Sequence, residues 1–177
     1  MPYWTQDIGG FFKPKNQYKS VEFSRLMIRW FQFGVFTPLF RVHGDHSDTE
    51  LWNYKVKFDG KSVQDIVVQS AIQFRYRLLP FIYSGFYQVY RNNYTMQRGL
   101  MLEFQNDINT YRINDQFMFG KEFMIAPVYS DQNERKVYFP VDKSYRPNLT
   151  YFNFFTGEKE VPSTSKDVRF TLENFPV

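Results

Sequence analysis

The chain has 177 residues, of which 43% are hydrophobic and 23% charged, as in an ordinary globular protein, so disorder is not expected as its main state. It has no cysteine and only two histidines, which excludes disulfides, cysteine nucleophiles, thiolate metal sites and a histidine-rich metal site. The net charge of +4 suggests an anionic partner, but the basic residues are scattered and lie in no nucleic-acid motif, so we expect no nucleic-acid binding.

The first elements in chain order are a strand, a helix and a second strand. Residues 3–8 predict a short strand that Gly9-Gly10 ends. Apolar residues then recur at helical spacing from Ser20, a suitable N-cap, to Gly34, a suitable stop. Residues 35–42 predict a second apolar strand, and a polar loop follows from 45 to about 61.

A longer helix is expected from about Ser62 to Asn92. Its apolar residues keep the helical period, and they are Val63, Ile66, Val67, Ala71, Phe74, Leu78 and Ile82. Pro80 should kink or divide this helix, because proline lacks a backbone donor and crowds the preceding turn. The order strand, helix, strand, helix is typical of a parallel sheet with crossover helices.

From about Tyr94 the pattern changes to short apolar runs separated by turn residues, which predicts antiparallel β structure. The runs expected to form strands are 100–104, 117–119, 123–128, 136–139 and 150–155. The change places a domain boundary near residue 93 and divides the chain into residues 1–93 and 94–177.

Three stretches taken together resemble glycoside hydrolase family 31. They are PYWTQDIGGFF at 2–12, RWFQFG with TPLFRVHG between 29 and 44, and RYRLLPFIY at 75–83. Further matches follow in the family's order at 97–100, 115–120 and 126–128. Each stretch alone is a weak signal, but their order along the chain makes the resemblance specific.

The resemblance implies a (β/α)8 barrel followed by β-sandwich domains. Residues 1–93 are then expected to be the last two β/α units of the barrel, and 94–177 part of an antiparallel β-sandwich. A complete barrel takes about 250 residues, so roughly three quarters of it is absent, and the missing N-terminal part of the barrel is an expected partner. Residues 174–177 match the start of a strand that the family continues, so both ends look cut.

The candidate site residues are Asp7, Phe11, Arg41 and His43. Barrel enzymes place their sites at the C-terminal ends of the strands, where Asp7 and His43 fall. Without the resemblance, Asp7 would be interpreted as a turn residue and His43 as a packing or surface residue. The resemblance implies that both contact the sugar in the −1 subsite and that Phe11 helps wall it, while Arg41 either contacts the site or forms a barrel-closing salt bridge.

A retaining glycosidase needs two carboxyl groups about 5 Å apart. One loop carries three acidic residues, Asp45, Asp48 and Glu50, which we interpret as solvated. The same loop could line the edge of the substrate cleft, but we assign no such role to His46 or Glu50. The resemblance places both catalytic aspartates before Asp7, so we expect no catalytic residue and no activity in this chain alone. It also implies no cofactor, and no metal site is expected.

The function implied for the parent enzyme is retaining exo-hydrolysis of an α-linked oligosaccharide or glycoside, with an α-xyloside as first choice and an α-glucoside as second. The alternatives are a non-catalytic carbohydrate-binding remnant, a structural piece that completes another chain, and a truncated gene model. The sequence shows neither a signal peptide nor an apolar run near the roughly 20 residues of a membrane helix. No membrane partner is therefore expected, and the location stays open, with a periplasmic or secreted parent compatible with the sequence.

Overall fold

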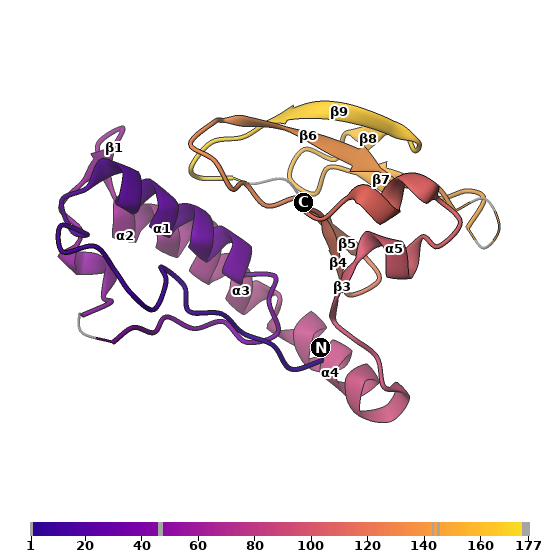
Figure 1. Ribbon diagram of the computed structural model, residues 1–177, viewed down its shortest axis with the longest axis horizontal. Coiled ribbons are helices and arrows are strands. Elements are labelled where there is room, and N and C mark those ends of the chain that lie inside the picture. The colour runs from indigo at the N-terminus through magenta and orange to yellow at the C-terminus, as the bar shows by residue number, and fades with distance from the viewer. Residues whose placement is uncertain (1, 46–47, 143, 145, 175–177) are drawn as a thin grey trace.

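The computed structural model describes residues 2–45, 48–142, 144 and 146–174. Helices dominate up to about residue 93 and short strands dominate after it, and Figure 1 shows the two parts lying side by side. We call them the helical half and the β-rich half. No helix in the described part of the chain has the length and apolar character needed to cross a membrane.

Helix α1 (Val21–Gly34) begins and ends as the sequence predicts. The Ser20 hydroxyl accepts a hydrogen bond of 3.0 Å from the amide of Phe23, which satisfies one of the free donors of the first turn. Met27, Ile28 and Phe31 are buried on one face, as the helical spacing requires. Leu26 is an exception, because the spacing places it on the apolar face and the structure leaves it exposed.

The predicted long helix is divided into four pieces, which are α2 (Val63–Val67), a π-helical turn η2 (Val68–Ile72), α3 (Gln73–Arg77) and α4 (Leu79–Asn92). Pro80 lies in the first turn of α4, so the expected division at this proline is confirmed. A capping box between Ser62 and Asp65 starts α2. Asn93 ends α4 in the left-handed conformation, with φ at 52°.

The two strands predicted in the helical half are reduced to a single parallel bridge between Ile8 and Val42. The two segments do run side by side, because the amide of Ile8 donates to the carbonyl of Arg41 at 3.2 Å. For residues 35–42, the prediction of a continuous strand is wrong for a local reason. The amide of Thr37 bonds back to Gly34 in a turn that extends the end of α1, and Pro38 has no amide to offer.

The polar loop between the predicted strand and helix is more ordered than expected. It holds a 3-10 turn η1 (Leu51–Asn53) and a hairpin of β1 (Lys57–Phe58) and β2 (Lys61–Ser62). Asp59 and Gly60 join the two strands with positive φ values of 48° and 81°, the backbone conformation that a tight two-residue hairpin requires.

The described residues of the β-rich half form three antiparallel sheets. The first is formed by β3 (Gln97–Gly99), β4 (Phe117–Phe119) and β5 (Phe123–Ile125), the second by β6 (Glu134–Phe139) and β9 (Thr164–Arg169), and the third by β7 (Tyr151–Phe152) and β8 (Lys159–Glu160). The antiparallel pairing agrees with the prediction. The short helix α5 (Leu100–Glu103) and the 3-10 turn η3 (Ile108–Arg112) link β3 to β4.

Several predictions in this half need correction. Strands β3 and β8 were not among the expected strands, and the runs 123–128 and 150–155 form strands only at Phe123–Ile125 and Tyr151–Phe152. Residues 100–104 were expected to form a strand, but Leu100–Glu103 is α5, in which Leu100 is buried while Met101 and Leu102 face outward. A run of apolar residues this short does not distinguish a strand from a helical turn. Strand β9 was not among the expected strands, because its residues are almost all polar and exposed.

Strand β4 separates two parts of the core by its side-chain alternation. Phe117 and Phe119 face a cluster built mainly from the helical half, where Phe119 packs against Phe36 with ring centroids 5.8 Å apart. Met118 faces the second cluster, which belongs to the β-rich half. The two halves therefore share one core rather than meeting only at their surfaces.

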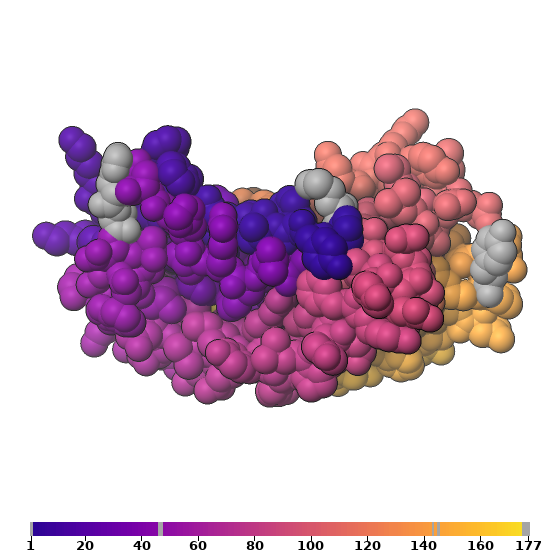
Figure 2. Space-filling model, turned by 90° about the horizontal axis from the view of Figure 1, so that it is seen from below, coloured from indigo at the N-terminus to yellow at the C-terminus, as the bar shows by residue number. Residues whose placement is uncertain are grey.

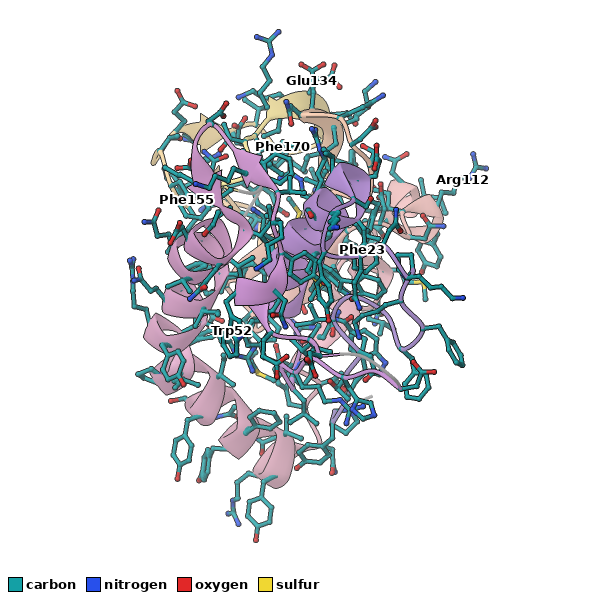
Figure 3. The ribbon with its side chains drawn as sticks, turned by 90° about the vertical axis from the view of Figure 1, so that its left-hand side faces the viewer. Phe23, Trp52, Arg112, Glu134, Phe155 and Phe170 are labelled. Carbon is teal, nitrogen blue, oxygen red and sulfur yellow. The ribbon has the colours of Figure 1, made fainter. Side chains whose placement is uncertain are left out.

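Polar side chains of α1 also hold the β-rich half. Arg29 is 4% exposed and donates to the carbonyl of Thr171 at 2.7 Å, while Gln32 donates to the carbonyl of Leu172 at 2.9 Å. The Arg29 guanidinium lies 5.0 Å from the ring centre of Phe170, and Figure 3 shows Phe170 between the strands and the helices. Burial lowers the pKa of Arg29 to about 10, which leaves it charged at neutral pH.

Candidate functional site

The first part of the site is the turn that follows Asp7. The amide of Gly10 donates to the carbonyl of Asp7 at 2.7 Å, and Gly9 and Gly10 have φ values of 85° and 79°. A Cβ carbon at Gly9 would lie 2.6 Å from the sulfur of Met27 on α1. Glycine is therefore required at position 9 both by the left-handed backbone and by the close approach of α1.

Asp7 forms an ion pair with Arg41, which enters from the neighbouring segment. Arg41 donates from Nη2 at 2.7 Å and from Nε at 3.2 Å, and both bonds reach the same oxygen, Oδ1. The Asp7 side chain is 21% exposed and that of Arg41 53% exposed. Of the two roles expected for Arg41, the structure shows a salt bridge, and its partner is the candidate site residue itself. Arg41 leaves Oδ2 of Asp7 available to accept hydrogen bonds from a ligand.

Phe11 and His43 form the second pair of the site. Their ring centroids are 5.5 Å apart with a tilt of 56°, and Phe12 packs edge-on to Phe11 at 5.0 Å. All three side chains are exposed. The parallel bridge between Ile8 and Val42 explains why these residues meet, since it aligns the ends of two segments that are far apart in the sequence.

A lysine that the sequence did not single out joins the two turns. The Lys13 ammonium donates to the carbonyl of His43 at 3.0 Å, and the amide of Asp45 donates to the carbonyl of Phe11 at 3.3 Å. Only the fold reveals this contact, because Lys13 and His43 are 30 residues apart and scattered lysines carry no motif.

Behind the site, Arg75 fixes the segment that leads to Arg41 and His43. Its guanidinium donates to the carbonyls of Val35 and Thr37, each at 2.6 Å, and to that of Pro38 at 2.9 Å. Arg75 is 7% exposed, and burial lowers its pKa to about 10, so it remains charged at neutral pH. This buried cation provides the hydrogen bonds for three carbonyls of an irregular stretch of backbone.

The expectation that the acidic side chains after His43 are solvated is confirmed for one residue and wrong for another. Asp48 is exposed, as expected. Glu50 is half-buried, and its Oε2 atom is buried with no hydrogen-bond partner among the described residues, so the expectation of a solvated side chain is wrong for it. His46 lies outside the described residues. In the described part of the chain, no group of three or more His, Asp or Glu side chains has an arrangement that could hold a metal ion.

Phe11, Arg41 and His43 are exposed, and Asp7 is half-buried beside them. A cavity of about 420 Å³ lies in the β-rich half, where its lining includes Phe123, Val137, Phe139 and Tyr151. Figure 2 shows the N-terminal segment lying along the surface of the helices. Two neighbouring segment ends can present polar and aromatic groups, but further walls are needed to enclose a small ligand.

Sequence comparison identifies this arrangement. Residues 1–85 match the family model described as the glycosyl hydrolases family 31 TIM-barrel domain, and residues 93–177 match the glycosyl hydrolase family 31 C-terminal domain. The chain is 36% identical over 178 residues to an α-xylosidase of Saccharolobus solfataricus. That match covers 100% of the chain and 22% of the relative.

Structural comparison gives the same family. An α-xylosidase from a soil metagenome, solved in complex with xylose, superposes with a TM-score of 0.85 at 28% identity, over 99% of this chain and 27% of that one. A dextranase of Flavobacterium johnsoniae, solved with glucose, gives a TM-score of 0.84 at 30% identity, over 99% of this chain and 20% of that one. The chain thus spans between a fifth and somewhat over a quarter of the length of these relatives, and it belongs to glycoside hydrolase family 31.

Proposed function

We propose that this chain is the C-terminal segment of a retaining, exo-acting α-glycoside hydrolase and supplies part of the −1 subsite. The observation that carries the proposal is the alignment of two segment ends at the bridge between Ile8 and Val42, which brings the pair Asp7 and Arg41 and the pair Phe11 and His43 to the same edge. The proposal assigns residues 1–93 to the last two β/α units of the barrel and 94–177 to part of a β-sandwich. The ranges of the two family models support this division.

Each of the four residues has a distinct role in the proposed subsite. The free Oδ2 of Asp7 accepts hydrogen bonds from neighbouring sugar hydroxyls, and the His43 imidazole donates one. Arg41 holds Oδ1 and so fixes the direction in which Oδ2 points. Phe11 provides an apolar wall beside His43, against which the C–H face of a sugar ring packs.

The proposal places the two catalytic carboxylates outside these 177 residues, so the chain alone binds sugar weakly and hydrolyses nothing. An α-xyloside is the first choice of substrate, because a relative at 36% identity is an α-xylosidase and a similar structure was solved with xylose. An α-glucoside is the second choice, because the similar dextranase was solved with glucose.

A chimaeric enzyme tests the proposal. Residues 1–177 replace the matching segment of the Saccharolobus solfataricus α-xylosidase, and hydrolysis of 4-nitrophenyl α-xyloside and α-glucoside is measured. We expect the chimaera to hydrolyse the xyloside better than the glucoside. Asp7→Asn should lower kcat/KM by roughly 100-fold or more, because two charge-assisted hydrogen bonds of about 1.5–3 kcal/mol each are weakened.

The control is Asp167→Asn, which removes the same charge from an exposed position on β9 and should leave kcat/KM unchanged. A folded chimaera without activity, or one in which Asp7→Asn has no effect, contradicts the proposal. Hydrolysis by the 177-residue chain alone contradicts the placement of the catalytic carboxylates. Tight sugar binding by that chain without any rescue of hydrolysis in the chimaera supports the alternative of a carbohydrate-binding remnant.

A further inference from the structure

The side chain of Lys13 crosses both turns of the site. Its Cε atom lies 3.5 Å from the position of a Cβ carbon at Gly9 and 3.6 Å from that at Gly44, so the stem of the lysine touches both glycine positions. The ammonium itself donates to the carbonyl of His43 at 3.0 Å. One side chain therefore contacts the turn after Asp7 and the turn after His43.

The absence of a side chain at Gly44 makes room for the ammonium. A Cβ carbon there would lie 2.2 Å from Nζ of Lys13 and 3.1 Å from the carbonyl oxygen of Phe11. The φ of Gly44 is not positive, so its backbone conformation suits any residue. A substitution at Gly44 would instead disturb the close approach of Lys13. Next to it, the amide of Asp45 donates to Phe11 at 3.3 Å and provides a second tie between the turns.

The neighbouring carboxylates favour the position of the Lys13 ammonium beside Gly44. The carboxylates of Asp45 and Asp7 both lie close enough to attract the ammonium, and they oppose the effect of burial, which lowers the pKa of Lys13. The Asp7 carboxylate is thus placed between two cations, Arg41 in direct contact and Lys13 nearby.

We propose that Lys13 is a positioning residue of the sugar subsite, which sets the separation between the turn carrying Asp7 and Phe11 and the turn carrying His43. The inference rests on the proposed function and extends it, since it explains how groups on two separate turns are held in one geometry. Lys13 acts through the carbonyl of His43 and need not touch the sugar. A displacement of about 1 Å in such groups can cost about 100-fold in rate.

The chimaera described above separates this role from a merely structural one. Lys13→Met keeps an unbranched apolar stem as far as Cε and removes the ammonium. We expect kcat of the folded enzyme to fall by roughly 10- to 100-fold with KM within about threefold, because the lost alignment matters most in the transition state. The melting temperature should change little. Lys15→Met, at an exposed position two residues away, is the matched control and should behave as the wild type.

Gly44→Ala tests the contact between Lys13 and the turn after His43 by changing the turn instead of the lysine. Its Cβ carbon displaces the ammonium, so this change and Lys13→Met should each lower kcat, and the double variant should be no worse than the poorer single one. Multiplicative effects, or a loss of activity that only follows a loss of stability, overturn the positioning role.

The two proposals fail in different ways. A folded wild-type chimaera without activity contradicts the proposed function, whereas an active chimaera with unchanged kcat after Lys13→Met contradicts only the role of Lys13. Amide exchange in the 177-residue chain provides a test that needs no catalysis. Lys13→Met should speed exchange of the Asp45 amide at least tenfold, and an unchanged rate overturns the inference.

Discussion

Replacing Arg75 with methionine should destabilise the chain severely, although Arg75 has no carboxylate among the hydrogen-bond partners described for it. Its guanidinium donates to three backbone carbonyls, those of Val35, Thr37 and Pro38. Arg75 and the three residues that carry these carbonyls are all buried. Methionine fills a similar volume but donates no hydrogen bond.

Two opposing effects set the magnitude. Each hydrogen bond from a charged donor is worth about 1.5–3 kcal/mol, and a buried carbonyl left without a partner costs about 1–3 kcal/mol. Removing the guanidinium also removes the cost of keeping a charge out of water, which offsets several kcal/mol. Among the described hydrogen bonds, these three carbonyls accept from no group other than Arg75, so the first effect should prevail. We expect a net loss of about 3–5 kcal/mol, because three buried carbonyls lose their donor at once.

Urea denaturation of the 177-residue chain at neutral pH measures this loss. Arg77→Met is the matched control, because Arg77 is exposed on the same helix and should change the free energy of unfolding by less than about 1 kcal/mol. A loss below about 1 kcal/mol for Arg75→Met, or one no larger than that of the control, would refute the reasoning. It would mean that the carbonyls find other partners at little cost.

Three further changes have defined outcomes. Gly9→Ala should cost about 1–3 kcal/mol in a thermal melt, since φ is 85° and the new carbon meets Met27, and an unchanged melting temperature would count against the tight turn. Burial raises the pKa of the Tyr54 phenol above its ordinary value of about 10, so the unfolded chain releases this proton first and stability is lost as the pH rises past 10. Tyr54→Phe should therefore reduce the alkaline loss of stability in urea titrations while costing little at pH 7, where the hydroxyl has no hydrogen-bond partner among the described residues. Asp107→Asn should lower the free energy of unfolding by about 1.5–3 kcal/mol, because the carboxylate accepts from the Tyr138 hydroxyl at 2.7 Å and from the Val141 amide at 3.0 Å.

Local signals predicted α1 and the start of α4, but not the π-helical turn η2 or the helix α5. Ser20, the spacing of apolar residues and Gly34 define α1 without any tertiary information, and Pro80 marks the division before α4. The strands of the helical half were not predictable in the same way. An apolar run is compatible with a strand, but hydrogen bonds to a neighbour decide whether one forms, and the turn at Thr37 uses those donors locally.

The candidate site was likewise predictable only where a local motif marked its residues. Asp7 and His43 were chosen from motifs, and the geometry places each of them beside another candidate residue, Arg41 for the first and Phe11 for the second. Whether they bind sugar stays a prediction. Lys13 was missed, because its role depends on a contact across 30 residues and on the empty space at Gly44, neither of which leaves a pattern in the sequence.

The hydrogen bonds from α1 to the β-rich half bear on whether the two halves can be separated or exchanged. Arg29 and Gln32 bind backbone carbonyls near the C-terminal end, and Arg25 donates to the carbonyl of Asp131 at 3.1 Å. A proteolytic cut after Asn93 should therefore leave two pieces that migrate together until they are denatured. Because the acceptors are backbone carbonyls, a swap of the β-rich half between family members should keep these contacts only where the backbone at 131, 171 and 172 keeps its position.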